Sequence, residues 1–341
     1  MRPQSRLTPS GLLVTASLIA FPAVSHSEDF YKGKTINFVI GASPGEVFSI
    51  TAQAISRYMS KRIPGEPTII FQSMPGAAGI RAENYLYNVA SRDGLTIGMS
   101  LDNILLNQFL SPGQVKYQAD KFNWIGRVDR PTRVLFVHSD SAIKTVEDAK
   151  TRDVTVGITA PNTSTQIYPS MANAVLGTRF KEVSGYNGIA ALNLALERGE
   201  IEAVGANSWT NLRMTQPDWV RDKKIRPLFQ VSLARDPALP DTPTLLELCT
   251  TDAQRAIVRL LALSELGFYI LTPPDVPPER VEILRAAFNG AIAAPEYRED
   301  AKKLNIGFVS ASGEDMTRTV AEVQSTPTSL VSSFMRAIAF K

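Results

Sequence analysis

The 341-residue chain carries 36 basic and 33 acidic residues, so its formal net charge at pH 7 is only +3. This balance gives no electrostatic reason to expect binding to nucleic acid or to an anionic membrane surface. The length indicates roughly two domains of ordinary size, each able to build a core without cross-links. An internal disulfide is excluded because Cys249 is the only cysteine, and we expect it to be a small buried hydrophobe.

The N-terminal segment has the pattern of a cleaved secretory signal peptide. Arg2 and Arg6 precede an apolar run, and small residues suited to cleavage lie near Ser25 or Ser27. The alternative, a membrane anchor, is disfavoured because the run is shorter than the roughly 20 residues of a spanning helix. Removing residues 1–27 leaves 34 basic and 33 acidic residues, a mature charge of +1. We therefore expect an exported protein of the periplasm.

The first part of the chain alternates strands and helices. A buried strand is predicted at 34–40, a glycine-containing loop follows, and the next helix has apolar residues at helical spacing: Phe48, Ala52, Ile55 and Met59. A second strand at 68–72 leads through a loop at 75–79 into a helix with one apolar face: Ala82, Leu86 and Val89. A third strand is predicted at 95–99. This alternation favours a parallel sheet with helices on its faces.

The pattern restarts further along the chain. Strands are predicted at 134–138, 154–158 and 201–206, and helices at 146–150 and 167–176. A later helix stops at a glycine cap and has an apolar face: Ile189, Leu192 and Leu196, with Gly199 as the cap. The last predicted helix begins at a favourable Pro-Pro-Glu sequence: Pro277, Pro278 and Glu279, followed by Val281, Leu284, Phe288 and Ile292 on its apolar face.

Three loops follow predicted strands and are the candidate ligand-binding segments. Parallel α/β sheets bind ligands outside the carboxyl ends of their strands, which selects residues 41–48, 73–80 and 159–165. Two of these loops contain glycines and lead into helix N-termini. Free backbone N–H groups and the positive end of a helix dipole suit a carboxylate or another anion.

One loop also matches a nucleophile motif, because Gly41 to Gly45 reads G-x-S-x-G around Ser43. The residue after such a serine normally donates its N–H to an oxyanion, but Pro44 has no N–H to donate. After signal-peptide removal, His138 is the one histidine certain to remain as a base. No metal-ligand cluster or phosphate-binding lysine motif is present either. We therefore expect no catalytic residue, no metal ion and no cofactor.

Several segments, taken together and in order, resemble the Bug family, the extracytoplasmic solute-binding proteins of tripartite tricarboxylate transporters. Each motif is weak alone, but their order and spacing cover nearly the whole mature chain. The segments are VIGASPGEVFSITAQAISRYM (Val39–Met59), FQSMPGAAGIRAENYLYNVASRDGLTIGMS (Phe71–Ser100), KEVSGYNGIAALNLALERGEIEAV (Lys181–Val204), LFQVSLARDPALPDTPTLLEL (Leu228–Leu248) and PPDVPPERVEILRAAFNGAI (Pro273–Ile292).

The resemblance implies an α/β fold of the type II periplasmic-binding-protein kind, with two α/β lobes joined by two crossover strands. We expect lobe 1 to contain residues 28–128 and 234–341, and lobe 2 residues 129–233, with crossovers near 128–133 and 230–235. Such a monomeric receptor would capture a small organic acid and deliver it to the membrane subunits of a tripartite tricarboxylate-type transporter. A sensor of the same fold that docks on a signalling protein, and a secreted serine hydrolase, are the alternatives.

The resemblance also implies which residues bind the solute. Backbone N–H groups of the first two loops would hold its carboxylate: Ser43, Gly45, Glu46, Val47 and Phe48, with Gly76, Ala77 and Ala78. Residues of the second lobe would close over it: Thr163, Ser164, Thr165, Tyr186 and Asn207.

The first loop departs from the family pattern, which usually reads PPGGGTD or PPGGGSD. Here Glu46 and Val47 replace two glycines, and Ser49 replaces the aspartate. A carboxylate at position 46 would oppose an anionic ligand if it faced the ligand, whereas facing solvent it would only favour the helix N-terminus. We expect the outward orientation, because the other backbone donors are retained.

Overall fold

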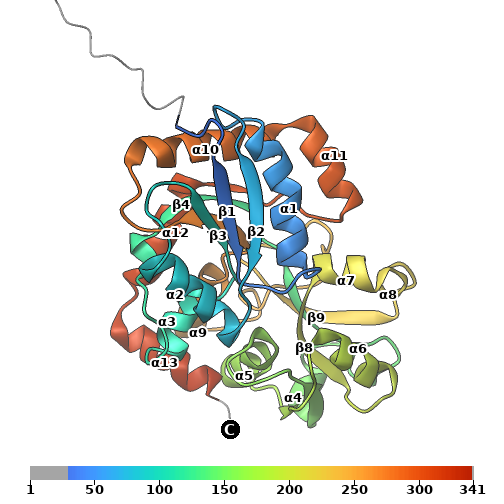
Figure 1. Ribbon diagram of the computed structural model, residues 1–341. Coiled ribbons are helices and arrows are strands. Elements are labelled where there is room, and N and C mark those ends of the chain that lie inside the picture. Colours follow the sequence, from blue (N-terminus) through green and yellow to red (C-terminus); the bar gives the residue numbers. More distant parts are fainter. Residues whose placement is uncertain (1–29, 340–341) are drawn as a thin grey trace, which may run out of the picture.

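Two separate sheets organise the chain, which this computed structural model describes over residues 30–339 (Figure 1). The predicted signal peptide, residues 1–27, lies outside the described residues. Each sheet is covered by helices and forms one lobe: lobe 1 contains the six-stranded sheet and lobe 2 the five-stranded sheet. The chain therefore has the expected two-lobed α/β architecture.

The sheet of lobe 1 has the order β11-β4-β10-β3-β1-β2. Its strands are β1 (Thr35–Ile40), β2 (Thr68–Ser73), β3 (Thr96–Met99), β4 (Asn123–Asp129), β10 (Phe268–Thr272) and β11 (Ala311–Ser312). Strand β1 pairs in parallel with β2 and β3, as the alternating pattern predicts. The sheet is nevertheless mixed, because β10 is antiparallel to both β3 and β4. The predicted parallel pairing is confirmed for β1, β2 and β3, and a strand from the distant C-terminal part adds antiparallel pairs because it inserts between β3 and β4.

The sheet of lobe 2 has the order β7-β6-β8-β5-β9. Its strands are β5 (Arg133–His138), β6 (Val154–Gly157), β7 (Phe180–Val183), β8 (Ala203–Ser208) and β9 (Ile225–Val231). Strand β6 is parallel to β7 and β8, whereas β5 is antiparallel to β8 and β9. Between β4 and β5 the chain passes from one sheet to the other in only three residues, so Asp129 and Arg133 lie where the lobes meet.

Lobe 1 is covered by helices on both faces of its sheet. They are α1 (Val47–Ser60), η1 (Ala77–Gly79), α2 (Ile80–Asn88), α3 (Ile104–Leu110), η2 (Ala119–Lys121), α10 (Pro278–Ala293), α11 (Pro295–Lys303) and α12 (Gly313–Gln324). The predicted apolar face of α1 is confirmed, because Phe48, Ala52, Ile55 and Met59 are all buried. The predicted face of α2 is right for Ala82 and Leu86 and wrong for Val89, which lies just after the helix and is 69% exposed.

Lobe 2 carries shorter helices. They are α4 (Asp148–Thr151), α5 (Ser164–Leu176), α6 (Ile189–Glu197), α7 (Trp209–Thr215) and α8 (Pro217–Arg221). Helix α5 begins three residues before the predicted start, directly after the polar loop that ends β6. Helix α6 ends close to Gly199, whose φ of +69° is the left-handed conformation expected of a helix-terminating glycine.

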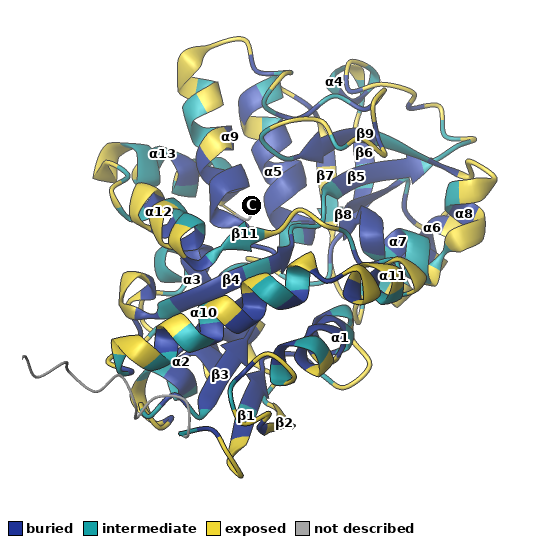
Figure 2. Ribbon diagram, turned by 90° about the horizontal axis from the view of Figure 1, so that it is seen from above, coloured by how far each residue is buried: buried dark blue, intermediate teal, exposed yellow. Residues whose placement is uncertain are grey.

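Two helices from the C-terminal part of the chain connect the lobes. Helices α9 (Asp252–Ser264) and α13 (Thr328–Ile338) lie beside α5 of lobe 2, with their buried faces turned together (Figure 2). The side chain of Gln166 donates to the carbonyl of Ile338 at 3.0 Å, and the side chain of Gln254 donates to the carbonyl of Val175 at 2.6 Å. One hydrophobic cluster consequently contains residues of both sheets. The division at residue 234 stays a prediction, with α9 and α13 in contact with lobe 2.

Two smaller expectations concern single features of the described chain. Cys249 is buried, which confirms its predicted role as a small core residue. Among residues 30–339, no helix combines the length and apolarity that crossing a membrane requires.

Candidate functional site

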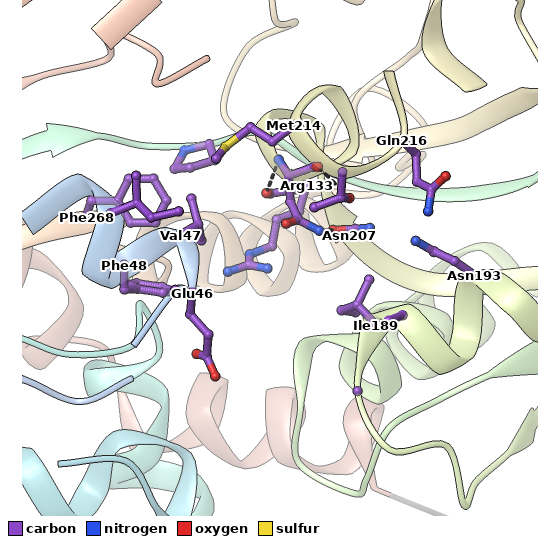
Figure 3. Close-up of a pocket in the computed structure, with 18 residues that line it drawn as sticks. Glu46, Val47, Phe48, Arg133, Ile189, Asn193, Asn207, Met214, Gln216 and Phe268 are labelled. Atoms are coloured by element: carbon purple, nitrogen blue, oxygen red, sulfur yellow. Dashed lines mark hydrogen bonds between the residues drawn. The ribbon is translucent and has the colours of Figure 1, made fainter. Parts of the chain in front are cut away.

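A cleft between the lobes contains two adjoining cavities, which share Phe48, Arg133, Gly188 and Ile189. We call the first the threonine compartment; it has a volume of about 630 Å³ and is lined chiefly by residues 77–80, 101–107 and 159–165. We call the second the amide compartment; it has a volume of about 610 Å³ and is lined chiefly by residues 45–48, 188–193 and 207–216 (Figure 3). Both have room for a small organic solute.

The first wall of the cleft is the start of α1. The SPGE sequence turns the chain after β1, where Gly45 has a φ of +85° and the amide of Glu46 donates to the carbonyl of Ser43 at 3.2 Å. The hydroxyl of Ser49 donates to the same carbonyl at 2.8 Å and ties the first helical turn to the loop. Phe48 packs edge-on against Phe268 with ring centroids 4.8 Å apart. The first turn of α1 is thereby fixed against the cleft, with its unpaired N–H groups at this end.

The second loop is held in a conformation that few residues adopt. Gly76, Ala77, Ala78 and Gly79 all have positive φ values, +132°, +48°, +51° and +91°. A left-handed conformation costs an alanine on the order of 1–3 kcal/mol, so the surroundings must impose it. Backbone strain of this kind concentrates at ligand sites.

Buried polar side chains beneath this loop supply the constraint. Asn107 donates to the carbonyl of Ala78 at 3.1 Å and to Glu83 at 3.4 Å, and the hydroxyl of Ser100 donates to the carbonyl of Gly79 at 3.3 Å. Burial raises the pKa of Glu83 to about 7, although hydrogen bonds from neighbouring side chains oppose the shift. The sequence indicated this loop but not its anchors, because a glutamate on an amphipathic helix ordinarily faces water.

The opposite wall is the loop between β6 and α5, where three threonine hydroxyls form one cluster. Thr163 and Thr165 lie 2.7 Å apart, and Thr159 lies 3.3 Å from Thr163 and 3.0 Å from Thr165. The hydroxyl of Thr163 also donates to the carbonyl of Ala160 at 2.7 Å. A Cβ on Gly205 of β8 would lie 1.9 Å from the carbonyl oxygen of Thr165, so only glycine permits this close approach. These contacts set the position of the N-terminus of α5.

The amide compartment is lined by side chains from α6, β8 and α7. Asn193 and Asn207 are 4% and 3% exposed, and Asn211 and Gln216 complete the set. Asn211 donates its amide to Oδ1 of Asn207 at 3.0 Å. Within residues 30–339, Oδ1 of Asn193 and Nδ2 of Asn207 have no hydrogen-bond partner. Figure 3 shows Asn193 and Asn207 on one side of this compartment and Glu46, Val47 and Phe48 on the other.

Arg133 lies at the junction of the two compartments, between carboxylates from distant parts of the chain. Its Nε lies 3.0 Å from Asp102 and 3.3 Å from Glu265, and Glu265 also accepts a hydrogen bond from the hydroxyl of Tyr168. Burial opposes the charge of the guanidinium, but the two carboxylates hold the pKa of Arg133 above its ordinary value. Burial raises the pKa of Glu265 to about 7, although Arg133 opposes the rise. The sequence analysis did not predict that Arg133, Asp102 and Glu265 would meet. The only indication in the sequence is that Arg133, a charged residue, lies inside the predicted crossover at 128–133.

Comparison with known proteins places the chain in a family. The family model of the tripartite tricarboxylate transporter family receptor (TctC) matches residues 51–334, most of the chain. The chain belongs to this receptor family. A protein encoded in the tcbD–tcbE intergenic region of Pseudomonas sp. (strain P51) is 28% identical over 306 residues, covering 84% of this chain and 82% of that protein.

Solved structures of TctC and Bug binding proteins have the same fold. A TctC solute-binding protein from Polaromonas has a TM-score of 0.68 at 20% identity, covering 89% of this chain and 99% of that one. MatC from Rhodopseudomonas palustris, solved with bound malate, has a TM-score of 0.64 at 18% identity, covering 90% and 99%. Another R. palustris protein, solved with adipate, has a TM-score of 0.62 at 17% identity, covering 89% and 97%. These likenesses show the fold of a two-lobed periplasmic binding protein.

Most site residues expected from the resemblance to this receptor family lie on the cleft. Gly45, Glu46, Val47, Phe48 and Asn207 line the amide compartment, and Ala77, Ala78, Thr163, Ser164 and Thr165, again with Phe48, line the threonine compartment. Three others have different surroundings: Ser43 offers its carbonyl to the α1 turn, Gly76 precedes η1, and Tyr186 packs against the core of lobe 2. Their role in binding stays a prediction.

Glu46 is exposed and lines the amide compartment. Its carboxylate lies at the α1 side of this compartment, with Ile189 across the opening (Figure 3). The side chain therefore contacts both solvent and the cleft, rather than lying on a surface remote from the ligand. Any solute group in the amide compartment meets a negative charge at this rim.

Proposed function

We propose that this protein is a solute-binding receptor that captures a small organic acid between its two lobes. The observation that supports this most directly is the meeting of three helix N-termini, those of α1, α5 and α6, at the threonine compartment, opposite the left-handed loop of Gly76–Gly79. Each terminus presents N–H groups without helical partners and the positive end of a dipole. A carboxylate placed there receives hydrogen bonds from several of them without a dedicated cation.

The two lobes give this site a means of closing. Thr163 and Ser164 belong to lobe 2 and Ala77 and Ala78 to lobe 1, so a bound carboxylate contacts both. Closure about the connection between β4 and β5 would bury the solute, as hinge motions do in periplasmic binding proteins. The malate and adipate in two proteins of this fold agree with an organic acid as the solute.

The proposal extends to delivery of the solute. The family name links such receptors to tripartite tricarboxylate transporters, and a protein of the same fold, BugD, is described as a periplasmic binding protein. The predicted signal peptide agrees with export to the periplasm. We therefore assign the receptor to that compartment, as a monomer that releases its solute to membrane subunits of such a transporter.

A hydrolase is not favoured by the positions of its candidate residues. Ser43 follows β1 in lobe 1, and its successor Pro44 has no N–H for an oxyanion. His138 ends β5 in lobe 2, and its Nδ1 accepts a hydrogen bond from the backbone of Asp140 at 3.3 Å. The histidine is therefore held at a strand end of the other lobe, and the receptor role is the better account.

Thermal unfolding with a panel of organic acids tests the proposal. The protein is first unfolded, dialysed free of co-purifying solute and refolded. A ligand that binds only the folded state adds about 2.7 kcal/mol at a hundredfold excess over Kd, so a binding acid raises Tm by several degrees. The methyl esters of the same acids are the control, because they keep the shape and remove the charge. Equal stabilisation by acid and ester, or no response to any acid, contradicts the proposal.

A further inference from the structure

The threonine compartment is lined by more negative charge than positive charge. The ionisable side chains among its lining residues are Asp102, Arg133 and Glu265, so two carboxylates share one guanidinium there. These side chains are only 10% to 17% exposed, and water therefore screens their charges weakly. The carboxylate of an organic acid that binds among the helix N-termini adds a further negative charge. With every carboxyl group ionised, three negative charges would then face one positive charge.

The guanidinium of Arg133 compensates the two carboxylates unequally. Its Nε, at 3.0 Å, and a terminal nitrogen both donate to Asp102. Glu265 lies farther away, 3.3 Å from the same Nε, and its other carboxylate oxygen accepts from the neutral hydroxyl of Tyr168. Burial raises the pKa of Glu265 to about 7, against the charge of Arg133 and with support from the charge of Asp102. Glu265 is therefore the carboxylate of this pair that gives up its charge more readily.

We propose that binding of an organic acid in the threonine compartment is coupled to the uptake of a proton by Glu265, so that the receptor binds most tightly in mildly acidic solution. The proton comes from water and is held on the carboxyl group of Glu265, which leaves Asp102 and Arg133 as a neutral pair. The solute then supplies the only uncompensated charge of the compartment. This inference rests on the proposed function, because it places the carboxylate of the solute in the threonine compartment.

Glu265 also borders a second cavity on the other side of the cluster. Asp102 and Glu265 both line this cavity of about 290 Å³, which lies beside the connection between β4 and β5. The charged groups that line it with them are Arg130, Arg235 and Asp236. Arg130 opposes the raised pKa of Glu265 less than Arg133 does. A solute that fills the threonine compartment thus leaves one side of Glu265 facing a separate cavity, from which a proton can reach it.

The direction of the pH dependence follows from the charges. A nearby negative charge disfavours the ionised form of a carboxyl group, so the pKa of Glu265 is higher with the solute bound than without it. Affinity is therefore greatest below the pKa of the free protein, about 7, and falls as the pH rises through the higher pKa of the complex. For an upward shift of about one unit, Kd rises about fivefold between pH 6.5 and pH 8.5.

Isothermal titration calorimetry with propanoate, malate, glutarate and adipate tests the coupling on protein freed of co-purifying solute by unfolding, dialysis and refolding. These acids are almost fully ionised from pH 6.5 upwards, so a proton taken up on binding goes to the protein. Comparing binding heats at pH 7.5 in PIPES and in imidazole, whose ionisation enthalpies differ, gives the number of protons. We expect uptake of about half a proton per bound acid, and a Kd at least about fivefold higher at pH 8.5 than at pH 6.5.

Two results of this titration would overturn the coupling, and they differ in what they mean for the receptor. Binding without proton uptake, and with the same Kd at both pH values, overturns the coupling and leaves the organic-acid receptor intact. Binding of none of the four acids contradicts the proposed function, and the coupling, which rests on it, fails as well.

Variants identify the group that takes up the proton. Glu265→Gln keeps the shape and removes the charge, so proton uptake should vanish and Kd should stay within about twofold from pH 6.5 to pH 8.5. At pH 8.5 this variant should bind at least about threefold more tightly than the unmodified protein, a gain that damage to the site does not produce. Persistent uptake in Glu265→Gln, or its loss in Glu83→Gln instead, overturns the assignment to Glu265. The control Glu299→Gln, on the exposed face of α11, should change neither quantity.

A second variant tests the same group if Glu265→Gln does not fold. Tyr168→Phe removes a hydroxyl that donates to the ionised carboxylate of Glu265, and the pKa of Glu265 should therefore rise further. The pH at which Kd begins to increase should move upward by at least about half a unit. An unchanged or lower pH for this increase contradicts the role of Glu265.

Discussion

The two compartments of the cleft differ in how their polar groups are satisfied. In the threonine compartment the hydroxyls of Thr159, Thr163 and Thr165 bond one another, and Asn107 supports the carbonyl of Ala78. In the amide compartment Asn193 and Asn207 each retain a buried polar atom without a partner in the described chain. The polar groups of the first compartment therefore satisfy one another, whereas two buried polar atoms beside the second have no partner within residues 30–339.

This difference should affect both solute binding and the stability of the folded protein. A preorganised site loses little entropy when it binds, so the threonine compartment suits a group common to many solutes. An unpaired buried polar atom costs free energy, so Asn193 and Asn207 should weaken the folded state rather than support it. Three experiments, described in order of decreasing expected effect, test how differently the two compartments behave.

Arg133 belongs to both compartments, and its loss should have the largest effect. Arg133→Met leaves the partly buried carboxylate of Asp102 and the buried carboxylate of Glu265 without their cation. Removing one partner of a buried ion pair costs about 3–5 kcal/mol, and we expect the free energy of unfolding to fall by an amount in that range. Urea unfolding measures it, with Arg259→Met as the control, since the exposed Arg259–Glu322 pair should be worth about 0–1 kcal/mol. Equal losses in the two variants would mean that the Arg133 group contributes no more than a surface pair.

Glu83, beneath the threonine compartment, should make stability depend on pH. Burial raises its pKa from 4.5 to about 7, although neighbouring polar side chains, among them Asn107, which donates to it, oppose the rise. Folding therefore favours the protonated form, and this stabilisation is complete below about pH 4.5 and is lost as the pH rises through about 7. The shift corresponds to about 3 kcal/mol.

The variant Glu83→Gln removes this titration. Between about pH 4.5 and pH 8 its stability should fall by less than that of the unmodified protein, with a difference of up to about 3 kcal/mol in urea unfolding. Glu265 contributes a similar dependence, so the quantity to compare is the difference between the two proteins at each pH. The exposed Glu299→Gln serves as the control. Parallel pH profiles for the Glu83 variant and the unmodified protein would show that Glu83 is not the buried titrating group.

The smallest expected change in unfolding free energy comes from substituting one polar group of each compartment in the ligand-free protein. Thr163→Val removes a hydroxyl that has several partners, so we expect a loss of about 1 kcal/mol. Asn193→Leu removes an amide whose oxygen is buried and unpaired, so we expect no loss or a small gain. Thermal and urea unfolding of the two variants, compared side by side, measure the difference. A destabilising Asn193→Leu would show that the amide already has a partner in the free protein.

The sequence predicted those parts of the site that depend on local pattern. The strand at β1, the apolar face of α1 and the loops after β1, β2 and β6 follow from periodicity and from Gly and Pro positions. The antiparallel placement of β10 was missed because it depends on a pairing with β3 across more than half of the chain. Val89 was misassigned because periodicity continued one residue past the end of α2.

The missed site residues have a common physical origin. Asp102, Arg133 and Glu265 come from three distant segments and acquire a joint role only when the lobes meet. Asn193 occupies a helix position that looks like a polar surface residue, yet tertiary packing buries it. No local pattern marks a polar residue that long-range contacts will bury, and resemblance to a family identified only the loops together with Tyr186 and Asn207.

The contact between α5 and α13 also constrains the order in which the molecule can fold. Helix α5 is synthesised in the middle of the chain, and the helix that covers it, α13, ends at Ile338. Lobe 2 therefore keeps an incomplete core until α13 has been made. Contacts of such long sequence separation slow folding, since a large loop must close before they form. The nascent chain consequently cannot reach its final state before α13 leaves the ribosome, so lobe 2 should complete its folding only after α13 has been synthesised.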